Sequence, residues 1–192
     1  MILFTFAMCY SAIGQKSSWY IGGQVGFNST KVKDSDMKSS SWSFSPEVGT
    51  FLTDNVQLGL ALNLTGSTDN GSIGGIATEE KLTGVGGTLY SRYFFKPGMP
   101  FRPFVGLNIG YSTAKLTNKG IGSNLEVKMN TFGANLNAGF GYAIAPKWTV
   151  VGSLGVLGFS SSKEGDNYTE TNFGLDINTL GNRFTIGFYY TL

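Results

Sequence analysis

The stretch Val56-Gln-Leu-Gly-Leu-Ala-Leu-Asn-Leu64 decides the fold of this chain. An apolar side chain stands at every second position, and Gln57, Gly59, Ala61 and Asn63 fill the positions between. Successive side chains of a β-strand point to opposite faces, so this period of two predicts a strand. One face of that strand is apolar, and the other is small or polar.

The same alternation recurs along most of the chain. Together with the first stretch it predicts eight strands, at about 19–28, 41–52, 56–64, 83–95, 101–112, 129–144, 148–159 and 172–192. The seventh is irregular, because Val151, Leu157 and Phe159 fall on its small and polar face. The eighth changes parity near Gly181 and Asn182, which predicts a β-bulge.

The connections between these strands alternate in length. Three are short, at 53–55, 96–100 and 145–147, and four are longer and rich in Gly, Ser and Asn, at 29–40, 66–81, 113–124 and 160–171. Transmembrane barrels have short periplasmic turns and longer external loops. The pattern therefore predicts an all-β, eight-stranded antiparallel up-and-down transmembrane β-barrel with short periplasmic turns and four longer external loops.

The composition of the two faces fixes which one points outward. The second face is mostly Gly, Ser, Thr, Asn and Gln. In water, turning the apolar face outward would lose about 25 cal/mol for each Å² of wet apolar surface. In a bilayer the sign reverses, and a closed barrel pairs every backbone group. We therefore expect a hydrophilic lumen that is filled further by six aromatic residues, Tyr20, Phe51, Tyr90, Phe94, Phe104 and Tyr189.

The overall composition narrows the function. Charged residues make up 14% of the 192 residues, the net charge is +2, and the charges are scattered, so no nucleic-acid partner is expected. The absence of His removes the commonest general base and metal ligand. Ser153 lacks the Gly pattern of a nucleophile elbow and lies in a predicted strand. We expect no enzymatic activity, no cofactor and no metal site.

An apolar segment at the N-terminus predicts export. Residues 2–14 are uncharged and end in Ala12-Ile13-Gly14, a small-any-small pattern that suits signal peptidase. The run is shorter than the roughly 20 residues of a membrane-spanning helix. We interpret 1–14 as a signal peptide and 15–192 as the barrel domain, with a buried first strand as the alternative. No Lys or Arg precedes the run, so the signal is either minimal or begins upstream. The single cysteine, Cys9, falls inside it, which leaves the mature domain without a disulfide.

Isolated charges on the lumenal face form the candidate site. Glu47 and Arg92 both project inward by strand parity, each a few residues from a short turn. A buried unpaired charge is costly, so we expect an ion pair, extended by Arg102, Asp176 and Arg183, that plugs the barrel. Its role would be structural rather than catalytic.

Two further groups of residues lie at the ends of the predicted strands. Aromatic residues there are Trp19, Trp42, Tyr93, Phe95, Phe101, Tyr111, Trp148 and Tyr190. They indicate membrane-interface girdles, or they are ordinary strand formers. Charges of alternating sign occupy the loops, at Lys31, Lys33, Asp34, Asp36, Lys38, Lys115, Lys119, Lys163, Glu164 and Asp166. They form either a surface for lipopolysaccharide or another partner, or a solvated loop surface.

Four short stretches carry a resemblance to a known family. They are Pro46 to Asn55, Tyr90-Ser-Arg-Tyr-Phe-Phe95, Arg102-Pro-Phe-Val-Gly106 and Ala145-Pro-Lys-Trp148. In order and spacing they resemble the small outer-membrane β-barrel domain family, relatives of outer-membrane protein X and the barrel of outer-membrane protein A. The resemblance covers essentially the whole mature chain. It implies the outer membrane of a Gram-negative bacterium and no single activity.

The last eight residues resemble the C-terminal signal for insertion of outer-membrane barrels. Its positions are Thr185, Gly187, Tyr190 and Leu192. This resemblance implies export through the periplasm and contact with the barrel-assembly machinery. We expect a structural or surface-interaction protein with a largely filled lumen, whose loops meet a ligand, lipid or partner. The alternative is a narrow channel or transporter for small or apolar solutes.

Overall fold

The computed structural model describes residues 18–31, 38–73, 76–120, 123–164, 168–174 and 185–192. The predicted signal peptide, Asp176, Arg183 and the parity switch near Gly181 lie outside these residues. Within the described ranges, no helix is both long enough and apolar enough to cross a membrane.

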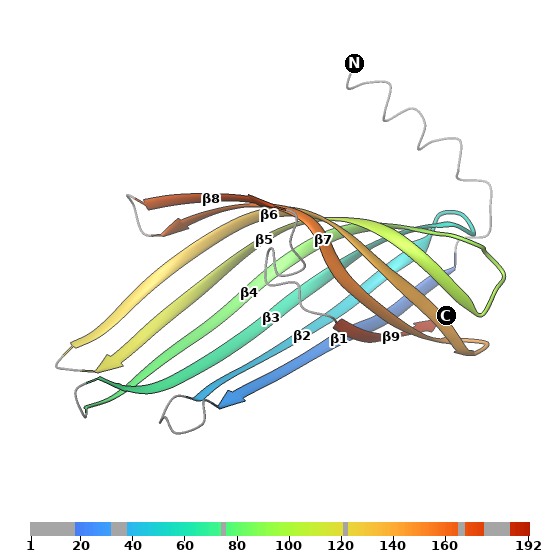
Figure 1. Ribbon diagram of the computed structural model, residues 1–192. Coiled ribbons are helices and arrows are strands. Elements are labelled where there is room, and N and C mark those ends of the chain that lie inside the picture. The colour runs from blue at the N-terminus through green and yellow to red at the C-terminus, as the bar shows by residue number, and fades with distance from the viewer. Residues whose placement is uncertain (1–17, 32–37, 74–75, 121–122, 165–167, 175–184) are drawn as a thin grey trace, which may run out of the picture.

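The described residues form a closed antiparallel barrel (Figure 1). Its strands are β1 (Trp19–Lys31), β2 (Lys38–Phe51), β3 (Val56–Ile73), β4 (Ile76–Phe94), β5 (Phe101–Gly120), β6 (Ser123–Ala145), β7 (Trp148–Glu164), β8 (Tyr168–Gly174) and β9 (Thr185–Thr191). Each strand from β1 to β7 pairs with the next, and β9 closes the ring by pairing with both β1 and β7. Both β8 and β9 pair with β7, at different heights, so together they occupy the eighth position. The predicted fold class is confirmed.

The strands extend far beyond the expected boundaries at one end of the barrel. The β3–β4 ladder continues to the pair Ile73 and Ile76, and the β5–β6 ladder to Gly120 and Ser123. Strand β6 has 23 residues, whereas a membrane crossing needs about 9–11. The segments 66–81 and 113–124, which the sequence assigned to irregular loops, are therefore mostly paired hairpins. These extensions are mostly polar, and their few apolar residues, such as Leu116, do not form a regular alternation, so the apolar pattern that defines a strand in the sequence ends too early.

At the opposite end of the barrel, the short turns connect neighbouring strands. Thr53 Oγ1 accepts hydrogen bonds from the backbone N–H groups of Asn55 and Val56, at 3.3 and 3.0 Å. The Asn55 side chain donates to the Phe94 carbonyl at 2.8 Å, which ties this turn to the end of β4. Gly98 has a φ of 83°, a backbone conformation that glycine adopts without steric cost. We call this the short-turn end, and the other the hairpin end.

The apolar face points away from the lumen. Leu58, Leu60 and Leu62 are 37, 58 and 48% exposed, whereas Tyr20 and Tyr90 are buried inside the ring of strands. The outward orientation that the sequence predicted is confirmed. Of the six aromatic residues expected in the lumen, five are buried and Phe51 packs against them.

A β-bulge explains the irregular pattern of the seventh strand. Leu136 of β6 pairs with Leu157 of β7, and the next residue, Asn137, pairs with Gly155. Val156 is therefore an extra residue in the ladder, and the outward positions change from even to odd numbers across it. This returns Leu157 and Phe159 to the apolar face.

Candidate functional site in the barrel lumen

A buried ion pair lies inside the barrel near the short-turn end. Glu47 of β2 and Arg92 of β4 are 6 and 3% exposed, and Arg92 Nη2 lies 3.3 Å from Glu47 Oε2. Both strands flank β3, where Glu47 pairs with Ala61 and Arg92 pairs with Gln57, so the two side chains share the inner face at positions four residues apart along β3. The structure thus brings together these two members of the predicted charge network.

Arg92 has further partners that the sequence did not suggest. Its Nη1 donates to Gln57 Oε1 at 3.1 Å and to the Tyr189 hydroxyl. The guanidinium carbon also lies 4.1 Å from the centre of the Tyr90 ring. Charge-assisted hydrogen bonds and the ring face both favour the cation at this buried position. Gln57 is fully buried, and its place on the polar face of the central stretch was the only sequence signal for it.

Arg102 is separate from this pair. Its guanidinium lies over the rings of Phe51 and Phe94, at 5.9 and 5.4 Å from their centres. Among the described residues no ion pair joins it to Glu47, and its Nε has no hydrogen-bond partner. Arg102 lines a cavity of about 480 Å³ at the short-turn end, together with Thr53 and Asp54. The expectation that Arg102 extends the ion pair is therefore not met in this part of the chain.

Large aromatic side chains surround the ion pair and fill the lumen beside it. The hydroxyl oxygens of Tyr20 and Tyr90 lie 2.6 Å apart, and the rings of Phe94 and Phe104 are 5.1 Å apart. A Cβ at Gly59 would lie 2.5 Å from Tyr90 Cζ, so β3 admits the ring only because it carries glycine there. We call this cluster the aromatic plug, formed by Tyr20, Phe51, Tyr90, Phe94, Phe104 and Tyr189.

The lumen between the plug and the hairpin end has the opposite character. It contains cavities of about 160 and 320 Å³, and both are lined by Ser45, Asn63, Thr88, Asn108, Asn135 and Thr185. We call this region the vestibule. Its walls are hydrogen-bonded across strands, with Ser45 Oγ donating to Asn63 Oδ1 at 3.0 Å and Asn108 Nδ2 to Asn135 Oδ1 at 2.6 Å.

Glu47 and Arg92 form the floor of the smaller vestibule cavity. Glu47 Oε1 and Asn137 Oδ1 face this region without a hydrogen-bond partner among the described atoms. The cavity at the short-turn end shares no lining residue with either vestibule cavity. Among the described residues, the plug thus lies between the hydrophilic vestibule and the cavity at the short-turn end.

A family match agrees with this geometry. Residues 1–179 match the family described as outer membrane protein beta-barrel domain. The chain belongs to this family. Membership indicates the outer membrane of a Gram-negative bacterium, in a family of non-enzymatic barrels. No curated protein sequence matches the chain.

Several solved outer-membrane barrels are similar in structure at low sequence identity. The N-terminal barrel of Pseudomonas aeruginosa OprF is 17% identical, covers 93% of this chain and 98% of its own, and has a TM-score of 0.48. Neisserial surface protein A is 16% identical over 92% of this chain and 96% of its own, with a TM-score of 0.45. A major outer membrane protein of Thermus thermophilus is 14% identical over 93% of this chain and 100% of its own, with a TM-score of 0.49. The family assignment rests on the family match and not on these structures.

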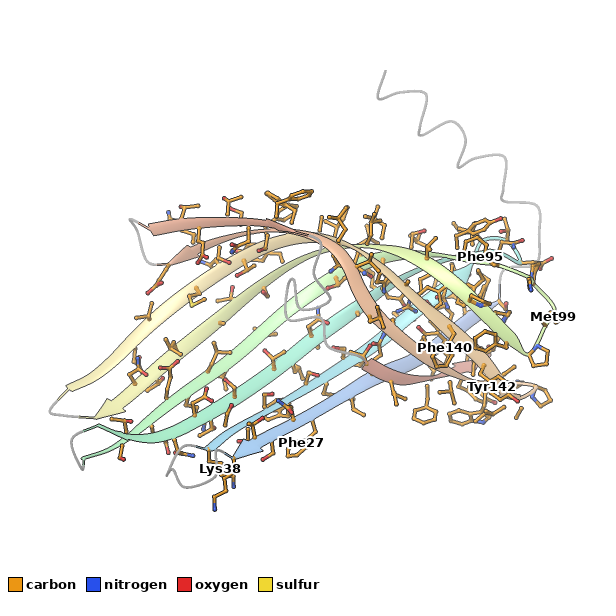
Figure 2. All side chains as sticks on the ribbon, in the orientation of Figure 1. Phe27, Lys38, Phe95, Met99, Phe140 and Tyr142 are labelled. Carbon is orange, nitrogen blue, oxygen red and sulfur yellow. The ribbon has the colours of Figure 1, made fainter. Side chains whose placement is uncertain are left out.

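The predicted girdle aromatics of this outer-membrane barrel domain lie on its outer surface, in two groups. Trp19, Tyr93, Phe95, Phe101, Trp148 and Tyr190 lie near the short-turn end, where Tyr93 packs on Phe95 and Trp148 on Tyr190. Trp42 and Tyr111 lie toward the hairpin end. The predicted girdle did not include Phe27, Phe132, Phe159 and Phe173, which are also exposed. Phe27 pairs with Trp42, Phe132 pairs with Tyr111, and Phe159 pairs with Phe173. Figure 2 shows Phe95 and Tyr142 projecting from the ribbon near the short-turn end.

The residues of the predicted insertion signal close the barrel. Thr185 Oγ1 lies 3.1 Å from Ser153 Oγ of β7, and the Leu192 N–H donates to the Trp19 carbonyl at 2.9 Å. Tyr190 pairs with Ile21 of β1 on one side and with Trp148 on the other. Their use as a recognition signal stays a prediction.

Proposed function

We propose that this protein is a sealed outer-membrane anchor that presents β-hairpins at the cell surface. The observation that carries this proposal is the aromatic plug with its buried ion pair. The interior of an eight-stranded barrel is narrow enough for its own side chains to fill it. Here a single layer of rings and the bonded Arg92 guanidinium fill the lumen, and the cavities on the two sides share no lining residue.

The alternative of a narrow channel is tested by conductance in planar bilayers. We expect the wild-type barrel to show no steady pore. The variant Phe94→Ala/Phe104→Ala removes two rings of the plug and serves as the matched control. It should show conducting events more often than wild type. A steady wild-type current that the double substitution leaves unchanged would contradict a sealed lumen.

We also propose that the hairpin end faces outward and is the contact surface. The long extensions of β3 to β6 support this orientation, because transmembrane barrels place their longer connections outside the cell. Shortening each hairpin in turn between its paired strands leaves the apolar band and the plug intact. Pull-down on intact cells should lose a bound component with one particular hairpin, and unchanged recovery from every shortened form would argue against a surface role.

For assembly we propose export by the signal peptide 1–14 and insertion by the barrel-assembly machinery. The position of β9 between β1 and β7 supports late closure by the C-terminal strand. N-terminal sequencing of membrane-inserted protein should begin at residue 15. The variant Tyr190→Ala should reduce the inserted fraction, whereas Tyr142→Ala on the same surface serves as its control. Equal insertion of the two variants would speak against the signal. We propose no catalytic role, in keeping with a sequence that contains no histidine.

A further inference from the structure

The charged residues at the hairpin end are sorted by face. Among the lysines whose side chains the structure describes, six exposed ones occupy positions of the outward face, one each on β1, β2, β4, β5, β6 and β7: Lys31, Lys38, Lys81, Lys115, Lys128 and Lys163. The acidic residues Asp69, Glu80, Glu164 and Glu170 have the opposite parity on their strands. Glu79 and Glu126 share the outward face, and Glu126 Oε1 lies 2.8 Å from Lys115 Nζ. We call the six lysines the lysine collar.

Each collar lysine stands at a constant distance from the apolar band. It lies four positions nearer the hairpin tip than an exposed apolar residue of its own strand, in the pairs Phe27/Lys31, Trp42/Lys38, Val85/Lys81, Tyr111/Lys115, Phe132/Lys128 and Phe159/Lys163. Four residues of strand are about 13 Å long. At a strand tilt of about 40°, each lysine therefore stands about 10 Å above its apolar residue along the membrane normal. Figure 2 shows Lys38 nearer the hairpin end than Phe27, with both side chains projecting from the barrel.

The ladders show that the collar lies at one level around the barrel. Lys38 of β2 shares a row with Lys119 of β5, through Asn70 and Glu79. Lys163 of β7 shares a row with Thr113 of β5, which lies six positions before Lys119 and so nearer the short-turn end. Because the strands tilt, a level line must shift in this way from strand to strand.

The aromatic residues at the short-turn end show the same shift. Trp19 of β1 shares a row with Leu107 of β5, whereas Tyr142 of β6 shares a row with Phe101, again six positions lower. In both cases the level moves by six positions over five strand-to-strand steps, from β2 to β7 and from β1 to β6. The collar therefore runs parallel to the aromatic residues at the short-turn end. A ring of lysines parallel to the membrane plane is the result.

We propose that the lysine collar binds the phosphate groups of lipopolysaccharide in the outer leaflet. This rests on the proposed outward orientation of the hairpin end. The collar level, about 10 Å beyond the last apolar ring, lies just past the headgroup layer, which extends about 5–8 Å beyond the hydrocarbon on each side, and the long lysine side chain can reach back into that layer. Basic side chains near an anionic headgroup layer are attracted to it, and the ammonium group of Lys is a common phosphate ligand.

The arrangement favours a lipid over a folded protein as the occupant. A protein partner would contact one side of the barrel, and its binding site would be a patch on two or three neighbouring strands. The collar instead occupies six strands around the circumference at one level. Only a partner that surrounds the barrel, as leaflet lipids do, meets all six charges.

The test measures binding of the purified, folded barrel in zwitterionic detergent to diphosphoryl lipid A. Monophosphoryl and dephosphorylated lipid A are the comparison probes. The variants are Lys128→Gln/Lys163→Gln and the replacement of all six lysines by Gln. Lys96→Gln/Lys147→Gln, in the short turns, is the charge-matched control. Heat-modifiable migration in gels confirms that each variant is folded.

We expect about a fivefold loss of lipid A affinity for each collar lysine removed, which weakens with added salt. The control pair should bind as wild type, and dephosphorylated lipid should bind all forms equally weakly. The proposal would be overturned if the variant with all six lysines replaced by Gln bound lipid A as tightly as wild type. It would also be overturned if the wild-type barrel bound phosphorylated and dephosphorylated lipid A equally. Surface labelling of Lys38→Cys in intact cells tests the orientation separately, so a failure of the proposed function is distinguishable from a failure of the collar.

Discussion

The two halves of the lumen are enclosed by the same strands and yet filled in opposite ways. In the plug, aromatic rings and a buried ion pair pack closely, and a cavity of about 480 Å³ lies beyond it at the short-turn end. Toward the hairpins, Ser, Thr, Asn and Gly line cavities of about 160 and 320 Å³. Strand number fixes the width of a barrel but not its contents. One layer of large side chains fills this barrel over part of its length, and the remaining described length of the lumen is lined by hydrophilic residues.

The difference also predicts where stability resides. The plug depends on close packing and on partners that water cannot replace, because its groups are desolvated. The vestibule is roomy enough for water to take over a lost hydrogen bond. Substitutions in the plug should therefore be costly, and equivalent ones in the vestibule should be mild.

The largest effect is expected from Arg92→Met. It leaves the Glu47 carboxylate buried without its partner and also removes the bonds to Gln57 and Tyr189. Loss of one member of a buried pair costs about 3–5 kcal/mol. Urea unfolding of the folded barrel in lipid vesicles measures it. The double variant Glu47→Gln/Arg92→Met should recover part of the loss, and simple additivity of the two single variants would show that the residues are not coupled.

A slightly smaller loss is expected for Phe104→Ala. The ring is buried against Phe94, and its removal creates a cavity inside the plug, at a cost of about 3 kcal/mol. The same unfolding measurement applies. A cost below about 1 kcal/mol would mean that the plug is loosely packed and resembles the vestibule.

Gly59→Ala tests the fit of the plug from the opposite direction. The added methyl group would lie 2.5 Å from Tyr90 Cζ and 2.7 Å from the Tyr20 hydroxyl, so we expect a loss of about 1–3 kcal/mol. Gly87→Ala on β4 is the control, because the nearest atom to its added Cβ is 4.0 Å away. Equal stability of the two variants would contradict the close approach.

The smallest effect is expected in the vestibule. Asn108→Ala removes the 2.6 Å hydrogen bond to Asn135, which faces the larger cavity. Water can replace the lost partner, so the cost should be about 0.5–1 kcal/mol. A loss as large as that of Arg92→Met would remove the distinction between the two halves.

Local alternation was sufficient to predict the eight strands, the outward leucines and the aromatic side chains of the lumen. It located Glu47 and Arg92 on the inner face because parity alone determines the side to which a strand residue points. It did not locate the strand ends at the hairpins, where the residues are mostly polar and the few apolar ones do not alternate regularly.

Contacts between distant strands were less accessible from the sequence. Gln57 and Tyr189 meet Arg92 from β3 and β9, and their approach depends on register, which a single strand does not encode. The extra residue Val156 shifts the register of β7 in the same way, and in the sequence it appeared only as an irregular pattern. The proposed role of the C-terminal residues in recognition stays a prediction.

The uninterrupted course of β4 has a mechanical consequence. One strand, Ile76–Phe94, carries Lys81 near its tip and Arg92 in the lumen, paired throughout with β3 and nearly throughout with β5. A pull on the hairpin runs along the strand axis, so many backbone hydrogen bonds resist it in shear at once. A force applied to this hairpin tip is therefore distributed over the backbone hydrogen bonds of β3, β4 and β5 and is not borne by a single loop.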